Sequence, residues 1–440
     1  MSARLLLYLF ILLFLMACTR KQTGTISQNV FLKTTFQNIK IHTSRGGTGP
    51  CEPSISIHPK NPEKMVAGSV LDNLYISEDG GFTWKIEKLT SPFGVYGDPV
   101  IRHDPGGNVY YSHLSNSKNK AYASEEFLDR IVVQKSSDHG KTWTRGTFPP
   151  VNHKKDHDKQ WKAIHPVTGA IAMTWTEFDR YGSPDKKDKS RILFSMSKDQ
   201  GDTWSEAVII SDNEGDCLDD DLTTEGAHPA FGINGEVFVV WAYDEKIWLD
   251  ISNDDGKTWG KDRVIADQIG GWAFSVPGIR RCNGFPTLKV DHSFAPTRGN
   301  LYVQWADQRQ GSDDTNIWCI TSNDAGKTWT KQATVHENLS GRHQFFSWMD
   351  VDNSTGFLYL VYYDRRQHDD ESTDVYLSYS IDGGKSFIDT QISESSFNAT
   401  PNVFFGDYND ICAMKGVIRP IWTRQEGNNL SVFTAIIQHK

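Results

Sequence analysis

The residues best suited to chemistry stand at the starts of successive predicted β-strands, with one small group in each repeating segment of the chain. They include carboxylates, guanidinium groups, imidazoles and phenols, which transfer protons and bind anions. This set comprises Arg45, Glu52, Tyr96, Asp98, Asp158, Lys159, Glu225, His228, Arg280, Arg281, Asn283, Arg342, His343, Asp407, Tyr408 and Asp410. Burying many carboxylates and arginines around one axis is costly unless they pair with one another or bind a ligand. We therefore expect this set to line one pocket.

Six copies of an eight-residue pattern divide the chain into the repeating units that position these residues. Each copy reads S-x-D-x-G-x-[T/S]-[W/F], and the copies begin at Ser77, Ser136, Ser197, Ser252, Ser322 and Ser380. The Asp can accept hydrogen bonds across a turn, the Gly supplies a positive φ, and the aromatic residue anchors the returning strand. A spacing of 55 to 70 residues is typical of stacked blades.

This pattern is the Asp box, and from the first copy to the last the chain resembles the sialidase or BNR-repeat superfamily of β-propellers. Residues 404–413, 417–422 and 430–437 read as three more strands after the last box, and the strand pattern at 30–42 has no local partner. We predict an all-β propeller of seven four-stranded blades, closed by pairing of the N-terminal strand with the last blade. Six blades are the alternative.

The strand order assigns the boxes and the candidate residues to opposite faces of the propeller. In an antiparallel blade of strands A to D, the start of A and the B–C turn share one face, called here the first face. The A–B and C–D turns, and with them the Asp boxes, lie on the second face. We therefore predict a structural role for the boxes and place the site on the first face.

The resemblance to sialidases implies individual roles for these residues. Sialidases pair a tyrosine nucleophile with a glutamate, use an aspartate as acid/base, and bind the substrate carboxylate with three arginines. Tyr408, Glu225 and Asp98 would then be catalytic in a retaining mechanism, with Asp72 as a second candidate for the acid. The substrate-binding residues would be Arg45, Asp158, Arg281, Arg342, His343 and Asp407.

These roles predict a surface-tethered exo-glycosidase of sialidase type that cleaves acidic sugars from glycans. One alternative is a polysaccharide lyase acting on uronate-containing glycans, for which His228, His343, Tyr408 and Arg342 could serve. The other is a non-catalytic propeller that binds glycan or protein. Both stay open because the chain has Thr43-Ser-Arg45-Gly-Gly where sialidases carry [F/Y]-R-I-P.

The charge and composition of the chain narrow the classes of partner that we expect. The net charge of the 440 residues is −9 and there is no basic stripe, so nucleic acid is not an expected partner. We expect a glycan or polysaccharide substrate and a monomer. We expect no metal or other cofactor; the acidic loop at 212–221 could bind calcium but lacks the ordered spacing of an EF-hand.

The N-terminus predicts export and a lipid anchor. The apolar run from Leu5 to Ala17 is short for a membrane span, and Leu15-Met-Ala-Cys18 resembles a bacterial lipobox. We predict a lipoprotein signal peptide at 1–17, lipidation of Cys18, a tether at 18–29 and one propeller domain at 30–440. The protein would be extracytoplasmic and held to a bacterial envelope membrane, the outer membrane being expected, through that lipid alone. An ordinary secretory signal or a short anchor is the alternative.

Overall fold

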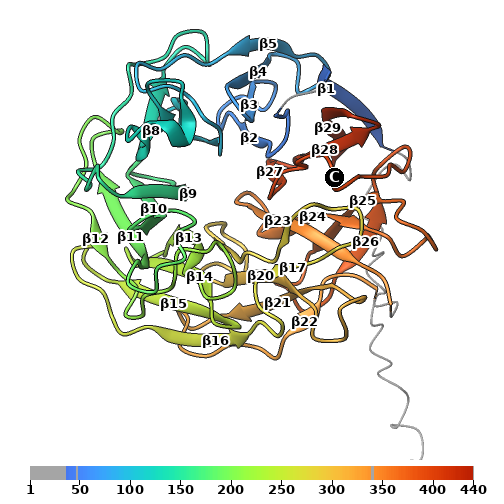
Figure 1. Cartoon of the computed structure of the whole chain (residues 1–440). Helices are drawn as coiled ribbons and strands as arrows, with labels where there is room; N and C mark the ends of the chain where they lie inside the picture. Colours follow the sequence, from blue (N-terminus) through green and yellow to red (C-terminus); the bar gives the residue numbers. More distant parts are fainter. Residues whose placement is uncertain (1–35, 46–47, 338–340, 440) are drawn as a thin grey trace, which may run out of the picture.

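The computed structural model describes residues 36–45, 48–337 and 341–439. In this part of the chain, seven β-sheets stand around a central axis like the blades of a propeller (Figure 1). The prediction of an all-β propeller with seven blades is confirmed, and the six-bladed alternative is wrong. The predicted signal peptide, the lipidation at Cys18 and the tether at 18–29 lie outside the described residues.

The first three blades follow the order of the sequence. Blade 1 contains β2 (Ser54–Ile57), β3 (Met65–Ser69), β4 (Asn73–Ser77) and β5 (Lys85–Lys88). Blade 2 contains β6 (Val100–His103), β7 (Val109–Asn116) and β8 (Phe127–Ser136), with the 3-10 turn η1 (Ala121–Ala123) in its B–C loop. Blade 3 contains β9 (Asp156–Ile164), β10 (Ile171–Phe178), β11 (Ser190–Ser197) and β12 (Val208–Ile209).

The next three blades repeat the arrangement. Blade 4 contains β13 (Glu225–Phe231), β14 (Val237–Tyr243), β15 (Lys246–Ser252) and β16 (Arg263–Asp267). A separate two-stranded ladder, β17 (Ala273–Phe274) with β18 (Cys282–Asn283), precedes blade 5. Blade 5 contains β19 (Thr287–Val290), β20 (Leu301–Asp307), β21 (Asn316–Ser322) and β22 (Ala333–Thr334). Blade 6 contains β23 (Gln344–Asp352), β24 (Phe357–Asp364), β25 (Asp374–Ser380) and β26 (Ile388–Gln391).

Blade 7 joins the two ends of the described chain. It contains β27 (Asp410–Met414), β28 (Val417–Glu426) and β29 (Asn429–Gln438), and β1 (Gln37–Arg45) is its outer strand. β1 runs antiparallel to β29, with Gln37 opposite Ile436 and Arg45 opposite Asn429. The strand expected at 30–42 is therefore observed at Gln37–Arg45, and residues 30–35 lie outside the described ranges.

Blade 2 departs from the four-stranded pattern. Its sheet has three strands, and a single bridge between Val133 and Thr147 stands where a fourth would pair. Pro149 and Pro150 follow closely. Because proline has no backbone N–H to donate, the ladder cannot extend through them.

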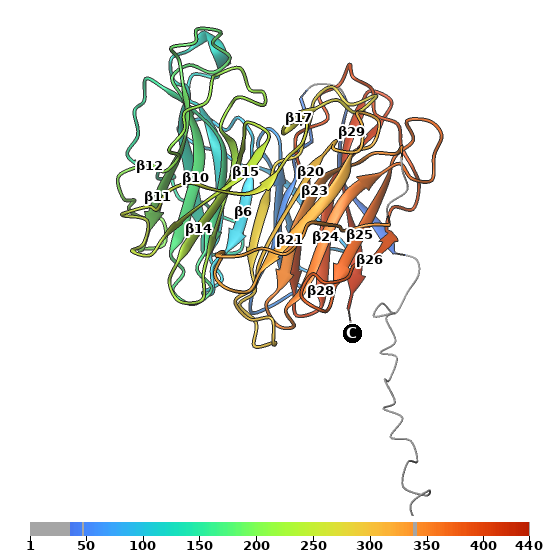
Figure 2. The same ribbon diagram turned by 90° about the horizontal axis from the view of Figure 1, so that it is seen from below.

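The Asp boxes are hydrogen-bonded turns on the second face, and each begins at the last residue of the third strand of its blade. Figure 2 shows the propeller edge-on, with the two faces at opposite ends of the strands. In the box of blade 2, Ser136 Oγ donates to Asp138 Oδ1 (2.8 Å) and accepts from Gly140 N (2.8 Å), while Thr142 Oγ1 donates to Asp138 Oδ2 (2.6 Å). The bonds from Thr142 lower the pKa of Asp138 to about 2. The carboxylate is thus occupied in closing the turn, as the structural role predicts.

We also searched the described residues for helices that could span a membrane. No helix in the ranges 36–45, 48–337 and 341–439 is long and apolar enough to cross a bilayer.

Candidate active site on the first face

The inner strands carry residues in an unusual backbone conformation near their first-face ends. Positive φ angles occur at Glu52 (53°), Asp98 (48°), Lys159 (52°), Gly226 (71°), Phe346 (49°) and Gly406 (97°). For a residue with a Cβ this conformation costs roughly 1 to 2 kcal/mol, and such positions cluster at functional sites. Glu52, Asp98 and Lys159 are the ionisable members of this group.

A bulge in β9 re-aims Lys159. Asp158 pairs with Thr176 and Trp161 pairs with Thr174, so Lys159 and Gln160 together stand opposite the single residue Trp175. A bulge of this kind changes the direction of a side chain relative to the regular ladder. The adjacent residues Asp158 and Lys159 can therefore both face the same cavity.

The first face holds a cavity of about 730 Å³, called here the first-face pocket. Its wall comes from the loops before the inner strands and from the long B–C loops of blades 2 and 3. The acidic, basic and phenolic residues of the wall are Glu52, Tyr96, Asp98, Tyr122, Asp158, Lys159, Tyr181, Arg280, Arg281 and Asp407.

Asp407 is the centre of an ion-pair cluster in this pocket. Arg281 Nε donates to Asp407 Oδ1 (2.9 Å) and Arg281 Nη1 donates to Asp219 Oδ2 (2.7 Å). Lys159 Nζ contacts Asp407 Oδ2 and lies 3.6 Å from Asp98 Oδ2. Burial alone would raise the pKa of Asp407, but the charges of Arg281 and Lys159 hold it well below its usual value. Asp407 is therefore an ionised anchor that fixes both cations.

The pKa values of the other carboxyl groups of the pocket are shifted in the opposite direction, upward. Burial, reinforced by the neighbouring Asp98 carboxylate, raises the pKa of Asp158 to about 8. Burial also raises the pKa of Asp98, and burial together with the Asp98 charge raises that of Glu52 well above its usual value. At neutral pH Asp158 is thus mainly protonated, which is the state required of a general acid.

An aromatic wall completes one side of the pocket. Tyr122, which is 69% exposed, stacks against Tyr181 with ring centroids 6.3 Å apart. Tyr181 donates its hydroxyl hydrogen to Asp219 Oδ2 (2.6 Å), which ties the wall to the Arg281 cluster. A partly exposed tyrosine pair offers a flat apolar surface with polar edges, and such surfaces suit the mixed character of a sugar ring.

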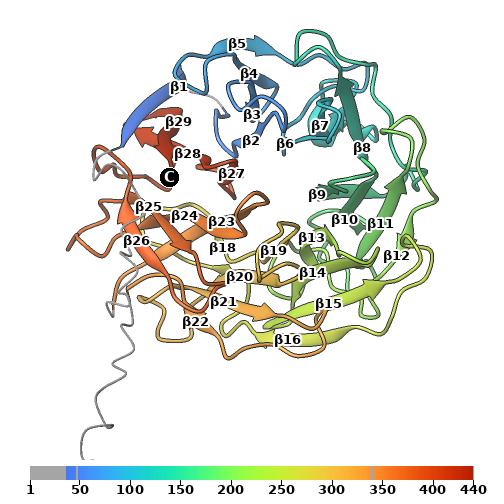
Figure 3. The same cartoon turned by 180° about the vertical axis from the view of Figure 1, so that it is seen from behind.

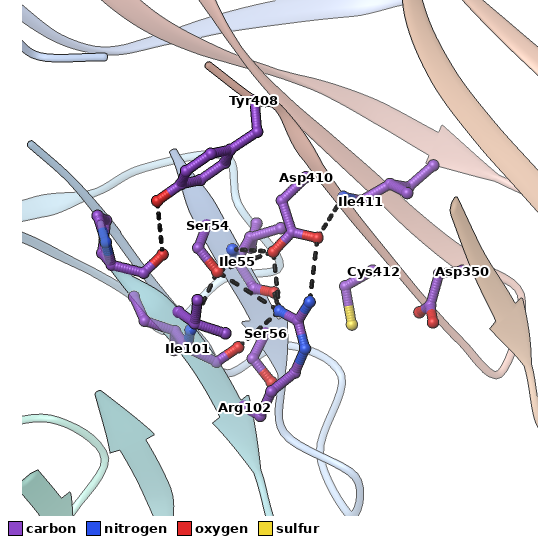
Figure 4. A network of polar contacts seen from close by, with 12 residues as sticks. Ser54, Ile55, Ser56, Ile101, Arg102, Asp350, Tyr408, Asp410, Ile411 and Cys412 are labelled. Atoms are coloured by element: carbon purple, nitrogen blue, oxygen red, sulfur yellow. Dashed lines mark hydrogen bonds and ion pairs between the residues drawn. The ribbon is translucent and has the colours of Figure 1, made fainter. Parts of the chain in front are cut away.

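Four of the residues with individually predicted roles come together here, namely Asp98, Asp158, Arg281 and Asp407, beside Glu52, Tyr96, Lys159 and Arg280 of the larger expected set. Tyr408 is buried and is not part of the pocket wall, and its ring packs against Trp161 and Trp348. Its hydroxyl group donates a hydrogen bond to Pro99 O (3.2 Å), drawn as a dashed line in Figure 4. Burial raises the pKa of Tyr408 well above its usual value. The phenol is thus held as a neutral donor in this geometry.

Glu225 lies close to this cluster but is enclosed. It opens β13, has no exposed surface, and neither carboxyl oxygen has a hydrogen-bond partner among the described residues. Burial and the Asp219 charge raise its pKa well above the usual value. No described contact joins Glu225 to Tyr408, so the paired nucleophile expected from the sialidase resemblance is not assembled here.

Three other residues with predicted roles lie elsewhere on the first face, whereas His228, also expected in the pocket, lines a cavity at the opposite end of the axis. Arg45 ends the outer strand of blade 7 and is not part of the pocket wall. Arg342 and His343 line a separate cavity of about 700 Å³, where Arg342 Nη2 donates to the exposed Asp369 (2.6 Å). Of the three expected arginines only Arg281 reaches the pocket, and two carboxylates already bind its guanidinium. The catalytic and binding roles assigned from sequence remain predictions.

Sequence reasoning did not single out Tyr122, Tyr181 or Asp219 as site residues. The two tyrosines lie in the B–C loops between β7 and β8 and between β10 and β11, which are long for hairpin connections. Long loops on a rigid scaffold often carry function, and this was the available signal. Asp219 belongs to the acidic loop considered for calcium, but its carboxylate binds Arg281 and Tyr181 instead.

The described residues offer no obvious metal centre. Among them, no group of three or more His, Cys, Asp or Glu side chains is arranged to hold a metal ion. The five cysteines of this part of the chain, Cys51, Cys217, Cys282, Cys319 and Cys412, are all free thiols.

Comparison with known proteins supports the fold. No family model matches the sequence, and no curated protein matches it. A PL25 ulvan lyase solved with -[GlcA(1-4)Rha3S]- has a TM-score of 0.54 at 11% identity, over 91% of this chain and 96% of that chain.

Two further solved structures resemble the chain with lower TM-scores. A protein of unknown function from Dyadobacter fermentans DSM 18053 has a TM-score of 0.48 at 13% identity, over 91% of this chain and 99% of that chain. The NanB sialidase of Streptococcus pneumoniae has a TM-score of 0.49 at 9% identity, over 85% of this chain and 83% of that chain. At 11% identity the likeness to the ulvan lyase shows a shared fold and leaves the chemistry to the site. The chain is a seven-bladed β-propeller with Asp boxes, and it is similar in fold to the ulvan lyase.

Proposed function

We propose that the protein is a glycoside hydrolase that cleaves acidic sugars from glycans in the first-face pocket. The observation that carries this proposal is the convergence of Glu52, Asp98 and Lys159, all at positive φ, with Asp158 and Asp407 around one cavity. A fold keeps several such costly positions in one place when the surrounding structure and its function require them.

The roles follow from the protonation states. Asp158 is the proton donor to the leaving-group oxygen because it holds its proton at neutral pH. Asp98 faces the same cavity. The Lys159 ammonium, 3.6 Å from Asp98 Oδ2, favours the ionised carboxylate against the effect of burial, and this form stabilises the positive charge that develops at the anomeric carbon. Asp407 takes no part in proton transfer, since Arg281 and Lys159 hold it ionised. These roles replace the Tyr408–Glu225 pair with two carboxyl groups.

The charge of the pocket favours an anionic substrate. Asp407 binds both Lys159 and Arg281, and Asp219 binds Arg281 as well, which leaves Arg280 as the cation of the wall that no described carboxylate pairs with. Arg280 is exposed, and its side chain makes no ion pair or hydrogen bond within the described part of the chain. We assign it to the carboxylate or sulfate of the substrate, because a guanidinium binds such groups with two hydrogen bonds.

A panel of fluorogenic sialosides and uronosides tests the proposal with the purified full chain. Wild-type protein should hydrolyse at least one member, and Asp158→Asn should lower kcat/KM by about 10²- to 10⁴-fold. Asp202→Asn is the matched control, because Asp202 is an exposed partner of Lys135 on the second face and should leave turnover unchanged. Absence of turnover on the whole panel would show that this is not a hydrolase of acidic glycosides.

A uronate lyase is the second candidate function. The structure with the TM-score of 0.54 is a lyase bound to a uronate-containing disaccharide unit, and three tyrosines, Tyr96, Tyr122 and Tyr181, line the pocket. A lyase forms an unsaturated uronate that absorbs in the near ultraviolet, whereas a hydrolase does not. Saturable binding of uronate polymers without either product would assign the pocket to a glycan-binding protein.

We also propose that the protein acts outside the cytoplasm on a lipid anchor at Cys18. The apolar run followed by Leu15-Met-Ala-Cys18 supports this location. Metabolic labelling with radioactive palmitate in a bacterial host should mark the wild-type chain and fail to mark Cys18→Ser. Equal labelling of both chains would rule out Cys18 as the lipidated residue.

A further inference from the structure

The second face of the propeller has a small cavity at its axis. All seven innermost strands, β2, β6, β9, β13, β19, β23 and β27, contribute to its wall, and they surround the axis in Figure 3. Its volume is about 190 Å³, and it is called here the second-face cavity. The basic and acidic side chains of its wall, apart from histidines, are those of Arg102, Lys162, Lys289 and Asp350.

The A–B turns of blades 3, 4 and 5 lie side by side next to this cavity. Pro166 in the first turn, Phe231 at the start of the second and His292 in the third all line it. The rings of His165 and Phe231 are 5.1 Å apart, and His292 Nε2 lies 2.9 Å from Phe231 O. These two contacts join the three turns into one continuous surface.

The same three turns carry apolar side chains that protrude into solvent. Phe294 in blade 5 is 96% exposed and Val167 in blade 3 is 81% exposed, the two largest fractions among the large apolar side chains of the described ranges. Ile233 in blade 4 is also exposed, and its Cδ1 atom lies 2.8 Å from the place that a Cβ would take at Gly299, in the turn of Phe294. Phe294, Val167 and Ile233 are called here the turn patch. Grouped exposed apolar side chains mark interaction surfaces.

The turn of blade 5 holds Phe294 in a fixed position beside a cation. Ser293 N and Thr297 Oγ1 each donate to an oxygen of Asp291 (2.7 Å in both cases). The Arg298 guanidinium lies over the Phe294 ring, 5.2 Å from its centroid. Arg298 is exposed, and within the described part of the chain no carboxylate pairs with it. An aromatic ring beside a free guanidinium suits a membrane surface, where the ring enters the headgroup layer and the guanidinium binds a phosphate.

The chain enters the propeller at this same face. β1 begins at Gln37, opposite Ile436 near the second-face end of β29. The 17 residues 19–35 separate the predicted lipid site Cys18 from Phe36, and they can reach about 60 Å at most. Figure 3 shows β1 across the axis from blade 4. A lipid on Cys18 and the turn patch would therefore hold one face of the propeller at two separate points.

We propose that the turn patch docks on the phospholipid membrane that carries the Cys18 lipid, with Phe294 and Val167 in the headgroup layer and Arg298 on a lipid phosphate. This inference rests on the lipid anchor proposed above, adds a protein contact to it, and is independent of the chemistry of the first-face pocket. A weak contact suffices, because the anchor keeps the patch near the membrane at a high effective concentration. The first-face pocket then points away from the membrane, toward glycans in the surrounding medium.

Quenching of a fluorescent label by lipids tests this orientation. The lipidated full chain is labelled at Val167→Cys on the turn patch, or at Leu222→Cys at an exposed first-face position, and is reconstituted in vesicles of phosphatidylethanolamine and phosphatidylglycerol. Nitroxide-labelled lipids should quench the label at position 167 at least about fivefold more strongly than the label at position 222. The chain without an added cysteine, treated with the same dye, gives the background from the native thiols.

Substitutions in the turn of blade 5 make the test specific. Phe294→Ser together with Arg298→Ser, added to the Val167→Cys chain, should reduce the quenching at position 167 at least about threefold. Ile269→Ser, which removes an exposed apolar side chain of the first face, is the matched control and should leave the quenching unchanged. All of these side chains are exposed, so the variants should fold, and equal Tm values check this.

Three outcomes would contradict the proposal in distinguishable ways. Equal quenching at positions 167 and 222, in chains that float with the vesicles, would overturn the orientation alone. Self-association of the wild-type chain in sedimentation, abolished by Phe294→Ser, together with equal quenching would assign the patch to a second copy of the chain. Chains that do not float with the vesicles would disprove the lipid anchor, and the proposed orientation would fail with it.

Discussion

The two ends of the propeller axis use the same seven inner strands for opposite electrostatic arrangements. At the first face, five carboxyl groups, those of Glu52, Asp98, Asp158, Asp219 and Asp407, surround a small number of cations. At the second face, the cations Arg102, Lys162 and Lys289 share only the carboxylates of Asp350 and Asp410. The first face thus offers several groups for proton transfer, whereas the second face has fewer carboxylates than basic side chains.

The backbone differs between the two ends as well. Positive φ angles occur at Glu52, Asp98 and Lys159 around the first-face pocket. The residues that line the second-face cavity follow the regular ladders of the inner strands, for example Arg102 opposite Tyr110 in blade 2. The fold thus accepts backbone strain at the wide end, where several ionisable groups must converge. This contrast supports placing the chemistry at the first face.

Loss of a buried carboxylate should give the largest effect on stability at either end. Asp407→Asn leaves Lys159 and Arg281 without their shared anion, and Asp410→Asn leaves Arg102 without its partner. Each change should lower the free energy of unfolding by about 3 to 5 kcal/mol, because an unpaired buried charge is costly. Denaturant unfolding measures both.

The same two variants separate the functions of the two ends. Folded Asp407→Asn should lose binding of acidic sugars, since Arg281 and Lys159 are no longer fixed. Folded Asp410→Asn should retain it. Loss of sugar binding in Asp410→Asn alone would reverse the assignment of the two ends.

The pH dependence of activity should follow Asp158. Its pKa of about 8 predicts that kcat/KM falls roughly tenfold per pH unit above pH 8, because the proton donor is then ionised. Asp158→Asn should remove this alkaline limb. A limb that persists in the variant would assign the proton to another group.

The same shift predicts a pH dependence of stability. The unfolded chain releases this proton near the ordinary value of 3.8 and the folded chain near 8. Between these values the folded state holds the extra proton, so rising pH favours unfolding across this window. In Asp158→Asn, the free energy of unfolding measured by denaturant titration should lose this part of its decrease with rising pH.

Removal of the exposed aromatic ring should have a smaller effect that is limited to the first face. Tyr122→Ala should raise KM for an acidic oligosaccharide about three- to tenfold with little change in kcat. The reason is that Tyr122, stacked on Tyr181, forms part of the aromatic surface that contacts the sugar before the chemical step. Phe294→Ala is the matched control, since Phe294 is a fully exposed aromatic ring outside both cavities. A fall in kcat with KM unchanged would exclude a simple binding role for Tyr122.

A change in an Asp box should have the smallest effect and should not reach the pocket. In Ser197→Ala, Gly201 N loses the hydroxyl acceptor that it meets at 2.8 Å. The expected cost is about 1 kcal/mol of unfolding free energy, with kcat/KM unchanged. A large loss of activity in a fully folded variant would show that the boxes do more than close turns.

The sequence predicted the repeating fold well because its signals are local. Six Asp boxes, the turn residues and the unpaired early strand were enough to predict seven blades. The three-stranded blade 2 was missed because the effect of Pro149 and Pro150 on pairing depends on where β8 and the following chain meet in space.

The site was harder to predict because it depends on the direction of side chains. Asp98, Asp158, Arg281 and Asp407 were placed together correctly by strand polarity alone. Tyr408 follows Asp407 directly, yet it does not line the pocket and its ring packs against Trp161. Such a choice between adjacent residues is decided by the bulges and positive φ angles of the inner strands, and no residue pattern specified these.

The most direct test of the account is a crystal structure of the full chain soaked with an acidic oligosaccharide containing a uronate. We predict density for the sugar in the first-face pocket, with its carboxylate within hydrogen-bonding distance of Arg280 and a glycosidic oxygen within reach of Asp158. Density for the sugar beside Arg342 and His343, or in the second-face cavity, would contradict the assignment of the catalytic site.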